Sequence, residues 1–415
     1  MIQSNLRSVG VIRRLLLAAS LLCSVQVAAR ATETHQTDLA AFFNEVDTAY
    51  RFFDLKGIRG DWDEAKPRLA AQAKTCAADT EFLGIVIEAI RCLRDAHMRL
   101  SNTKAPLPAL PAQYYPGLSL MPAMQNRVVV MWAADAHVGK LKSGTVVTRI
   151  DGQAARAFLE AKAKAAWGGA SPYFVSSPQR ARLFVYRMPL TGRRGDTHTL
   201  HYLAQGKEQE LRVTCDLEAR GWPHQYNMPT NLTRASRALA YRKLPSGVGY
   251  MYLRYVRTET EPGMRQALAA HPDAKGWILD LRGNGGGGYD DKLIELLKAL
   301  PRPVAVLLDA GCISAGETLA RDLARHANAR LLGARTAGSS SSKRQWAFPS
   351  GIASVTFSTR SRWRNDGQPI EFNGIAPDVE LEAVPEEVAQ GLNSEIRRAE
   401  EYLADMVAQH PEPIR

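Results

Sequence analysis

The spacing of apolar residues changes along this chain, and each change marks a different kind of predicted secondary structure. Over residues 36–104, apolar side chains recur three and four positions apart, as in LAAFFNEVDTAYRFF and EFLGIVIEAIRCLRDAHMRL. This spacing predicts helices, because residues three and four apart share one face of a helix. Over residues 113–218 the apolar runs are short, as in RVVVMW, TVVTRIDG, HTLHYL and ELRVTC, and glycine or charged residues separate them. These runs predict a small β-rich domain.

From about residue 246 onward, apolar runs alternate with segments of helical spacing. VGYMYLRY, GWILDLRG and PVAVLLD have the length and composition of buried strands. Alternation of this kind predicts an α/β layer with a largely parallel sheet covered on both faces. We interpret PTNLTRASRA as a linker before this layer, and residues 384–410 as a closing amphipathic helix.

A chain of 415 residues is long enough for several domains. Its first residues have the order of a secretory signal peptide: Arg7, Arg13 and Arg14 precede LLLAASLLCSVQVAA, and small residues end at Ala31. The apolar run is too short to span a membrane, and no later stretch offers another candidate. We therefore expect residues 1–31 to be removed, leaving an exported, periplasmic or secreted protein with no membrane contact.

The charge of the chain is only moderately basic. The formal net charge is +11, and residues 1–31 carry four arginines and no acidic residue, so the remainder carries 11 − 4 = +7. This excess is spread along the chain and is typical of a solvated surface. It predicts no nucleic-acid partner.

Four cysteines remain after position 31: Cys76, Cys92, Cys215 and Cys312. In an oxidising compartment Cys76 and Cys92 are candidates for a disulfide between neighbouring helices. No cysteine or histidine spacing typical of a metal site occurs, so we predict neither a metal nor a cofactor. Cys312 is interpreted as a small buried thiol.

Two segments of the α/β part carry candidate chemistry. Ser314 follows the apolar run PVAVLL and precedes a segment with helical spacing, which places it near backbone N–H groups at a strand-to-helix turn. A serine is a weak nucleophile unless a base takes its proton. The second segment, DLRGNGGGG, follows a buried strand. It fits a phosphate cradle, an oxyanion hole or a plain turn, although neither common phosphate-binding motif is present.

Four blocks together resemble a known family. GWILDLRGNGGG, ISAGE, LLGARTAG and DGQPIEFNGIAPDV occur over residues 248–380 in the order seen in the tail-specific (C-terminal processing) serine peptidases. That family has relatives in tricorn protease and the interphotoreceptor retinoid-binding protein. The resemblance implies an α/β, crotonase-like (ClpP/crotonase) catalytic domain over residues 232–383. It also implies that Ser314 is the nucleophile and that the N–H groups of Gly286 and Ala315 form the oxyanion hole.

The chain departs from the tail-specific branch at the position of the base. In that branch a lysine follows the T-x-G turn, whereas here Thr336, Ala337 and Gly338 are followed by Ser339. Lys343 is the nearest later lysine, but SSSSKRQ has the composition of an exposed polar loop, in which a lysine stays charged.

The tricorn-like branch uses a histidine and a glutamate instead. LRDAHMRL resembles its D-x-H block and singles out His97, and Glu371 lies in the E-x-x-G-I-x-P-D block. A neutral imidazole can accept the serine proton, and a carboxylate on its other nitrogen orients it. Asp95 could orient this segment, but we interpret it as a charge on a helix surface.

The β-rich segment resembles a PDZ-type domain. GLSLMPAMQNRVVVMW and VGKLKSGTVVTRIDGQ match its turn pattern in part, with Thr145 in place of an aspartate. Such domains add a peptide strand to a sheet edge and hold its carboxylate on loop amides. The resemblance implies that Gly117, Leu118, Ser119 and Leu120 form that substrate-binding loop, so this domain would select substrates.

The sequence therefore predicts an exported serine endopeptidase that cleaves peptides or unfolded protein segments through an acyl-enzyme. Two alternatives remain. Retinoid-binding relatives of this fold bind apolar ligands or peptides without peptidase chemistry, and a glycine turn of this kind also serves acyl transfer from thioesters. The substrate, the cleavage preference and the oligomeric state do not follow from the sequence.

Overall fold

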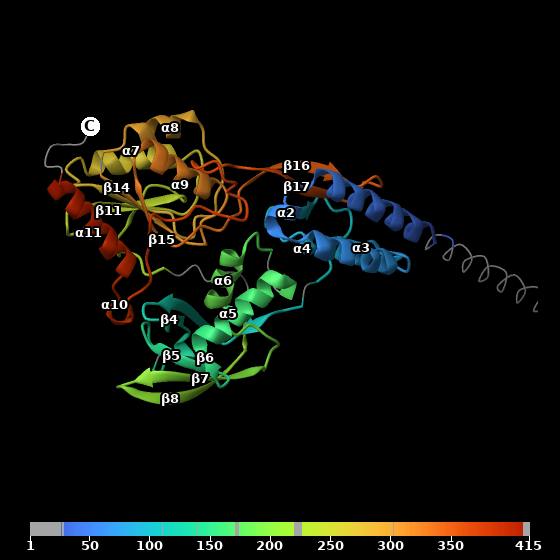
Figure 1. Cartoon of the computed structure of the whole chain (residues 1–415), viewed down its shortest axis with the longest axis horizontal. Helices are drawn as coiled ribbons and strands as arrows, with labels where there is room; N and C mark the ends of the chain where they lie inside the picture. Colours follow the sequence, from blue (N-terminus) through green and yellow to red (C-terminus); the bar gives the residue numbers. More distant parts are fainter. Residues whose placement is uncertain are drawn as a thin grey trace, which may run out of the picture. The chain divides into compact units, whose positions relative to one another are not determined.

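The computed structural model describes residues 26, 29–109, 111–137, 139–170, 174–219, 226–301 and 303–409 (Figure 1). Contacts divide the chain into two compact units, which are made of the following segments: Met1–Leu110 with Lys343–Arg360, and Pro111–Ser342 with Ser361–Arg415. The predicted signal peptide lies outside the described residues, except for positions 26 and 29–31, which are helical.

The first unit is mainly helical, as the apolar spacing predicts. A helix over residues 29–49 is followed by three more: α2 (Phe53–Lys56), α3 (Arg59–Ala73) and α4 (Asp79–Cys92). Their apolar faces bury large side chains: Phe42, Trp62, Phe82 and Leu83 are inaccessible to solvent. A three-stranded sheet completes the unit in the order β1-β17-β16: β1 (Arg99–Ser101), β17 (Ser354–Ser361) and β16 (Ser341–Ala347).

The boundaries of this unit differ from the predicted ones in one respect. Residues 343–360 lie inside the predicted catalytic segment 232–383, yet they pack with the helices of the first unit. The reason is strand pairing, since β17 pairs antiparallel with β1 and sets Leu100 opposite Val355. A pairing between such distant segments has no local signature in the sequence.

The predicted disulfide is wrong, because Cys76 and Cys92 are free thiols. Cys76 precedes the first turn of α4 and Cys92 is its last residue. A helix rises about 1.5 Å per residue, so the 14 residues of α4 separate its two ends by about 20 Å. A disulfide requires Cα atoms within about 7 Å.

The β-rich part of the second unit contains the predicted strands and two helices that the strand pattern does not indicate. Its sheet has the order β3-β4-β5-β7-β8: β3 (Leu118–Ala123), β4 (Arg127–Ala133), β5 (Val146–Ile150), β7 (Thr197–Ala204) and β8 (Lys207–Thr214). The helices are α5 (Ala155–Ala165) and α6 (Pro178–Arg187). Leu159 of α5 and Val185 of α6 belong to the core that covers this sheet. We refer to this part as the β-rich domain.

The predicted α/β layer is present in the same unit. Its sheet has the order β10-β11-β12-β13-β14-β15-β18: β10 (Thr233–Arg234), β11 (Leu239–Lys243), β12 (Gly249–Leu253), β13 (Trp277–Asp280), β14 (Val304–Leu308), β15 (Arg330–Gly333) and β18 (Val379–Glu380). The pairs from β12 to β18 are parallel, and β10, β11 and β12 pair antiparallel. Part of the predicted linker therefore forms β10 at the sheet edge.

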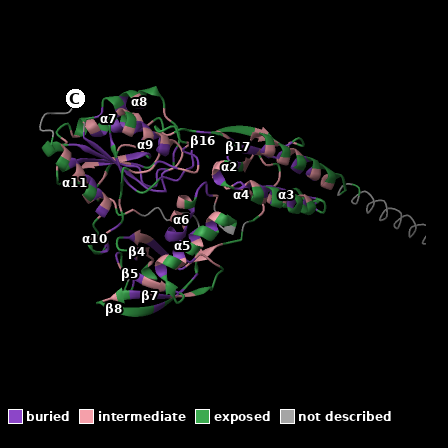
Figure 2. Cartoon of the chain, viewed as in Figure 1, coloured by how far each residue is buried: buried purple, intermediate pink, exposed green. Residues whose placement is uncertain are grey.

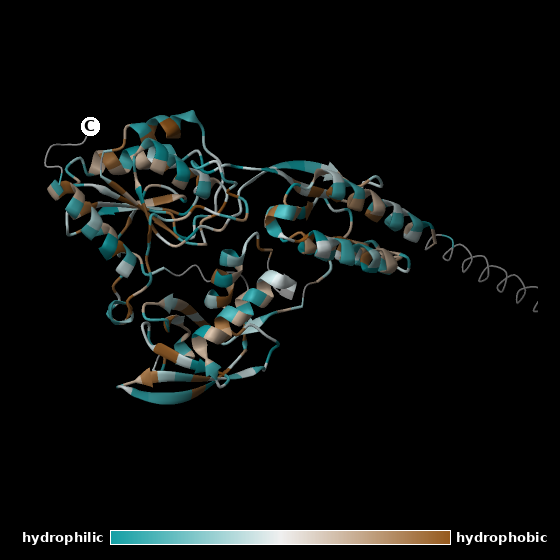
Figure 3. Ribbon diagram, viewed as in Figure 1, coloured by the Kyte–Doolittle hydropathy of each residue, from teal (hydrophilic) through white to brown (hydrophobic). Residues whose placement is uncertain are grey.

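Helices cover both faces of this central sheet (Figure 1). Val306 and Leu308 of β14 pack in the core with three helices: α7 (Thr260–Ala270), α8 (Asp291–Lys298) and α9 (Ala315–His326). Ala305 and Leu307 of the same strand face α11 (Ser394–Gln409). The strands are accordingly buried, whereas the helices expose one side (Figure 2) and carry mixed hydropathy (Figure 3).

The predicted closing helix is two helices, α10 (Pro385–Ala389) and α11. Gly391, with a φ of 75°, lies between them. In the part of the chain that the structure describes, no helix has both the length and the apolar character needed to cross a membrane.

Candidate active site

Ser314 lies in a tight turn between the end of β14 and the start of α9. Its φ of 55° and ψ of −121° are unfavourable for a residue with a side chain, and such strain occurs mainly where the surrounding structure requires it. The turn leaves Ser314 half-buried at the N-terminus of α9. Ala315 is the first residue of that helix, so its N–H group lies where the helix dipole is positive.

The glycine-rich loop touches this turn directly. A Cβ atom on Gly286 would lie 2.7 Å from Ser314 Cβ, and Gly286 has a φ of 74°, so only glycine fits here. The Gly286 N–H, however, donates to Asn284 Oδ1 at 2.8 Å. The N–H group predicted for the oxyanion hole is therefore bound to the Asn284 side chain in this conformation.

Glu317 holds the nucleophile turn against a second turn, and the sequence analysis gave this residue no role. Its buried carboxylate accepts the N–H groups of Ser314 at 3.1 Å, Gly338 at 2.7 Å and Ser339 at 2.9 Å, and the Thr336 hydroxyl at 2.6 Å. Burial raises the pKa of Glu317 to about 7, although these hydrogen bonds oppose the increase. The signal available was the glutamate three residues after the serine, which is typical of an N-terminal capping box.

Glu371 lies in the same network as Ser314. The side chain is fully buried, and its Oε2 accepts the Ser340 N–H at 3.0 Å. The Ser340 hydroxyl donates to the Ser314 carbonyl at 3.3 Å. Phe372, with a φ of 68°, follows Glu371, and its N–H donates to the Gly338 carbonyl at 2.7 Å. The structure thus brings Ser314, Gly286, Ala315 and Glu371 together.

His97 lies in the other unit, in the turn between α4 and β1. Its N–H donates to Asp95 Oδ1 at 2.9 Å. Burial lowers the pKa of the imidazole to about 4; Asp95 opposes this decrease, and Lys343 and Lys56 add to it. A neutral imidazole therefore prevails at neutral pH, which is the form that accepts a proton.

Asp95 is not the surface charge that the sequence suggested. It is fully buried, and its carboxylate lies 3.5 Å from the Lys56 ammonium. The hydroxyls of Tyr50 and Ser358 donate to it at 3.1 Å each. Burial raises the pKa of Asp95, but Lys56, His97 and the Tyr50 hydroxyl together lower it by more, and the net shift is downward.

The segment SSSSKRQ is not an exposed loop throughout. Ser339, Ser340 and Ser341 are buried, and residues from Ser341 onward form β16. Ser339 occupies the position of the family lysine; its carbonyl accepts the Ser314 N–H at 2.8 Å. Lys343 is exposed, as predicted.

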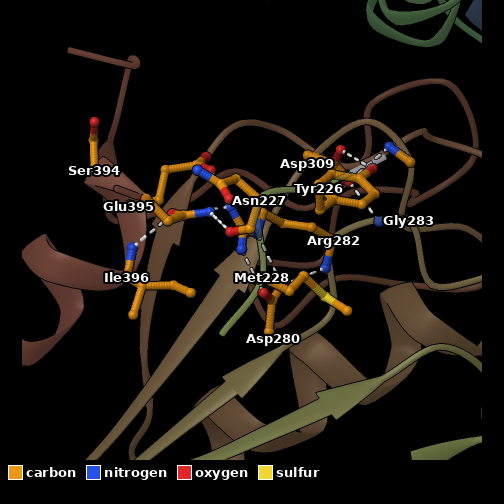
Figure 4. Close-up of polar contacts among 12 residues, drawn as sticks. Tyr226, Asn227, Met228, Asp280, Arg282, Gly283, Asp309, Ser394, Glu395 and Ile396 are labelled. Atoms are coloured by element: carbon orange, nitrogen blue, oxygen red, sulfur yellow. Dashed lines mark hydrogen bonds and ion pairs between the residues drawn. The ribbon is translucent and has the colours of Figure 1, made fainter. Parts of the chain in front are cut away.

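The DLR part of the glycine-rich block forms a buried charged cluster (Figure 4). Arg282 donates to both oxygens of Asp280, at 2.9 and 2.5 Å, and to Glu395. Asp309 Oδ1 accepts the N–H groups of Gly283 and Gly311, both at 2.9 Å. Asp309 therefore joins the start of the glycine-rich loop to the chain that leads into Ser314.

The remaining candidate residues are Cys312 and the predicted peptide-binding segment Gly117–Leu120. Cys312 is fully buried, and burial raises the pKa of its thiol far above the ordinary value, as expected of an inert thiol. Residues 118–120 are buried in β3, where the Ser119 hydroxyl donates to the Arg187 carbonyl at 2.7 Å. The Gly117 carbonyl accepts the Ala134 N–H at 2.7 Å.

Comparisons with known proteins agree with this geometry. The sequence profile of Peptidase family S41 matches residues 293–381, which include Ser314 and Glu371. No curated protein sequence matches the chain significantly. Mature CPAF has a similar structure, with a TM-score of 0.60 at 13% identity over 92% of this chain and 99% of that chain.

Two further structures are similar over most of this chain. They are tricorn protease (TM-score 0.47, 15% identity, 91% of this chain and 37% of that chain) and the photosystem II D1 C-terminal processing protease (TM-score 0.41, 18% identity, 89% and 97%). The CPAF structure shows a shared fold. The family match confirms the predicted class: the protein is a serine peptidase. The matched segment, residues 293–381, is similar to peptidase family S41.

Proposed function

We propose that this protein is an exported serine endopeptidase that cleaves peptides or unfolded protein segments through an acyl-enzyme on Ser314. The observation that carries the proposal is the strained turn at Ser314, which places the hydroxyl at the N-terminus of α9 against the glycine-rich loop. Strain of this kind is typical of a nucleophile turn. Export rests on the signal-peptide pattern alone.

In the proposed reaction Ser314 Oγ attacks the substrate carbonyl while His97 takes its proton. The Ala315 N–H and a second N–H from the glycine-rich loop stabilise the oxyanion. The leaving amine then takes the proton from His97, and water repeats the sequence to release the acid and free Ser314. Glu371 orients the imidazole, and its complete burial favours a fixed carboxylate.

A serine-reactive phosphonate tests this assignment. We expect it to label Ser314 in the mature protein, and we expect Ser314→Ala to abolish both labelling and hydrolysis of an unfolded protein. Ser246→Ala is the matched control, since Ser246 is an exposed serine hydrogen-bonded to Glu400. Undiminished turnover by Ser314→Ala would overturn the assignment.

We extend the proposal to the β-rich domain, as a PDZ-like module that captures substrate tails. β3 is an edge strand of its sheet, and a cavity of about 670 Å³ lies beside it. Leu120 and Met121 of β3 line this cavity together with Leu183 and Tyr186 of α6. Charged residues, including Arg182 and Arg187, also line the cavity, and a cavity of this mixed character at a sheet edge suits an extended peptide. Peptides with a free carboxyl terminus should compete with a protein substrate better than their amidated forms.

A further inference from the structure

Helix α6 belongs to the β-rich domain, but its first turn binds segments that carry candidate catalytic residues. The Ser177 side chain caps the helix by accepting the Arg180 N–H at 3.2 Å, and its hydroxyl donates to the Ala337 carbonyl at 2.5 Å. The Ser176 hydroxyl lies 3.2 Å from that of Ser339. These contacts fix the turn that Glu317 ties to Ser314.

A second contact reaches the segment of the catalytic acid. Gln179 Nε2 donates to the Phe372 carbonyl at 2.9 Å, one residue after Glu371. The ring of Trp167 packs against the Phe372 ring with centroids 5.6 Å apart. Phe372 has an unfavourable positive φ, so these contacts help to hold a backbone conformation that the residue would not adopt alone.

A third contact reaches the chain that enters the nucleophile turn. Arg180 Nη1 donates to the Ala310 carbonyl at 2.7 Å. Ala310 follows Asp309, whose carboxylate accepts N–H groups from Gly283 and Gly311. Arg180 therefore supports the junction between the glycine-rich loop and the Ser314 turn.

We propose that α6 positions the catalytic loops, with Arg180 and Gln179 as positioning residues supplied by the β-rich domain. The proposal rests on the proposed function of Ser314. Both side chains bind backbone carbonyls, so they fix where the loops lie without touching the reacting atoms. A displacement of about 1 Å in such loops can cost about a hundredfold in rate. The β-rich domain then contributes to turnover of every substrate, in addition to any role in selecting substrates.

The test compares Arg180→Met, Arg180→Lys and Gln179→Ala in the mature full-length chain. Gln179→Ala removes one hydrogen bond from a helix that keeps its cap and core, so it remains informative if Arg180→Met fails to fold. Arg212→Met is the matched control, because Arg212 lies on β8 of the same domain and donates to Thr197. Each variant is assayed for kcat and KM with a small activated ester and with an unfolded protein. Amide hydrogen exchange over residues 309–316 and 336–340 is measured without substrate.

We expect Arg180→Met and Gln179→Ala to lower kcat about tenfold on both substrates, with KM for the protein changed less than about twofold. We also expect amide exchange to be faster in both segments, and Arg180→Lys to recover part of each loss. A rise in KM for the protein with unchanged ester hydrolysis and unchanged exchange would overturn the proposal, because α6 would then only bind substrate. The exchange measurement tests the positioning role even if wild-type Ser314 proves unreactive. Failure of the positioning proposal is therefore distinguishable from failure of the proposed function.

Discussion

The two units of the molecule each use a buried carboxylate to fix a loop with a candidate catalytic residue, but they neutralise it differently. In the helical unit Asp95 accepts the His97 N–H and lies 3.5 Å from the ammonium of Lys56. In the other unit Glu317 accepts the Ser314 N–H, and its hydrogen-bond donors are backbone N–H groups and one hydroxyl. Both carboxylates are fully buried.

The difference teaches that burial alone does not decide the charge of a carboxylate. Burial raises the pKa of both groups, but at Asp95 the charge of Lys56, together with His97 and the Tyr50 hydroxyl, outweighs it and the pKa is lowered. At Glu317 neutral donors only partly compensate, and the pKa rises to about 7. The loop of His97 is thus held by a permanent charge, whereas the turn of Ser314 is held by a group that titrates near neutrality.

The largest expected effect comes from replacing His97, whose backbone N–H donates to Asp95. His97→Ala should slow acylation of Ser314 by about a thousandfold or more, because a positioned general base contributes about 10² to 10⁴ in rate. Glu371→Gln should cost less, since the imidazole remains, and Lys343→Ala should change little. Single-turnover rates with an activated ester measure acylation. If Lys343→Ala were inactive and His97→Ala kept most activity, the base would be the lysine.

The next largest effect is on folding stability and comes from breaking the ion pair between Lys56 and Asp95. Lys56→Met should destabilise folding by about 3–5 kcal/mol, because it leaves Asp95 buried without its cation. The double variant Lys56→Met/Asp95→Asn should regain at least half of this loss. Denaturant unfolding measures both free energies. A loss below about 1 kcal/mol in the single variant would show that the hydroxyl and N–H donors suffice to stabilise Asp95 without the cation.

A smaller effect is expected when one of the two carboxylate oxygens of Glu317 is replaced, because each oxygen accepts two hydrogen bonds. Glu317→Gln places an amide NH₂ against two of the four donors and should lower kcat by about 10- to 100-fold. Wild-type activity should fall as pH falls through about 7, because a protonated Glu317 no longer accepts all four groups. His97, with a pKa of about 4, stays neutral over this range.

The pH profile of kcat therefore tests whether Glu317 titrates near neutral pH. Glu317→Gln should show no acid limb near pH 7, whereas wild type should. The effect on stability has the opposite direction: the folded-state pKa exceeds the ordinary 4.5, so the contribution of Glu317 to stability decreases as pH rises from about 4.5 to about 7. An unchanged limb in Glu317→Gln would assign it to another group.

The smallest effect comes from a single donor. The Thr336 hydroxyl donates to Glu317 at 2.6 Å and accepts the Ile375 N–H at 2.7 Å. Thr336→Val keeps the shape and removes both bonds, so we expect a loss of about 1–2 kcal/mol and a higher pKa for Glu317. The midpoint of the acid limb should move upward by a measurable amount. An unmoved midpoint would mean that the backbone donors alone set the pKa.

The apolar pattern predicted the helical unit, the β-rich strands and the parallel α/β layer, because each depends on the period of residues along one segment. Ser314 was also within reach, since it follows a strand of that layer, whereas Glu371 was singled out only by the family resemblance. The predicted disulfide failed for a related reason: the pattern placed both cysteines beside helices but did not set Cys76 and Cys92 at opposite ends of α4.

What the sequence by itself determined is therefore local: the class of each element, the turn at Ser314 and the absence of a lysine after Gly338. Only the tertiary structure decided that Glu317 joins two turns, that Asp95 is buried beside Lys56, and that α6 reaches the catalytic loops. The physical reason is that these contacts join residues far apart in the chain. Hydrogen bonds to backbone carbonyls and N–H groups also require no particular residue at the other end, so no side-chain pattern records them.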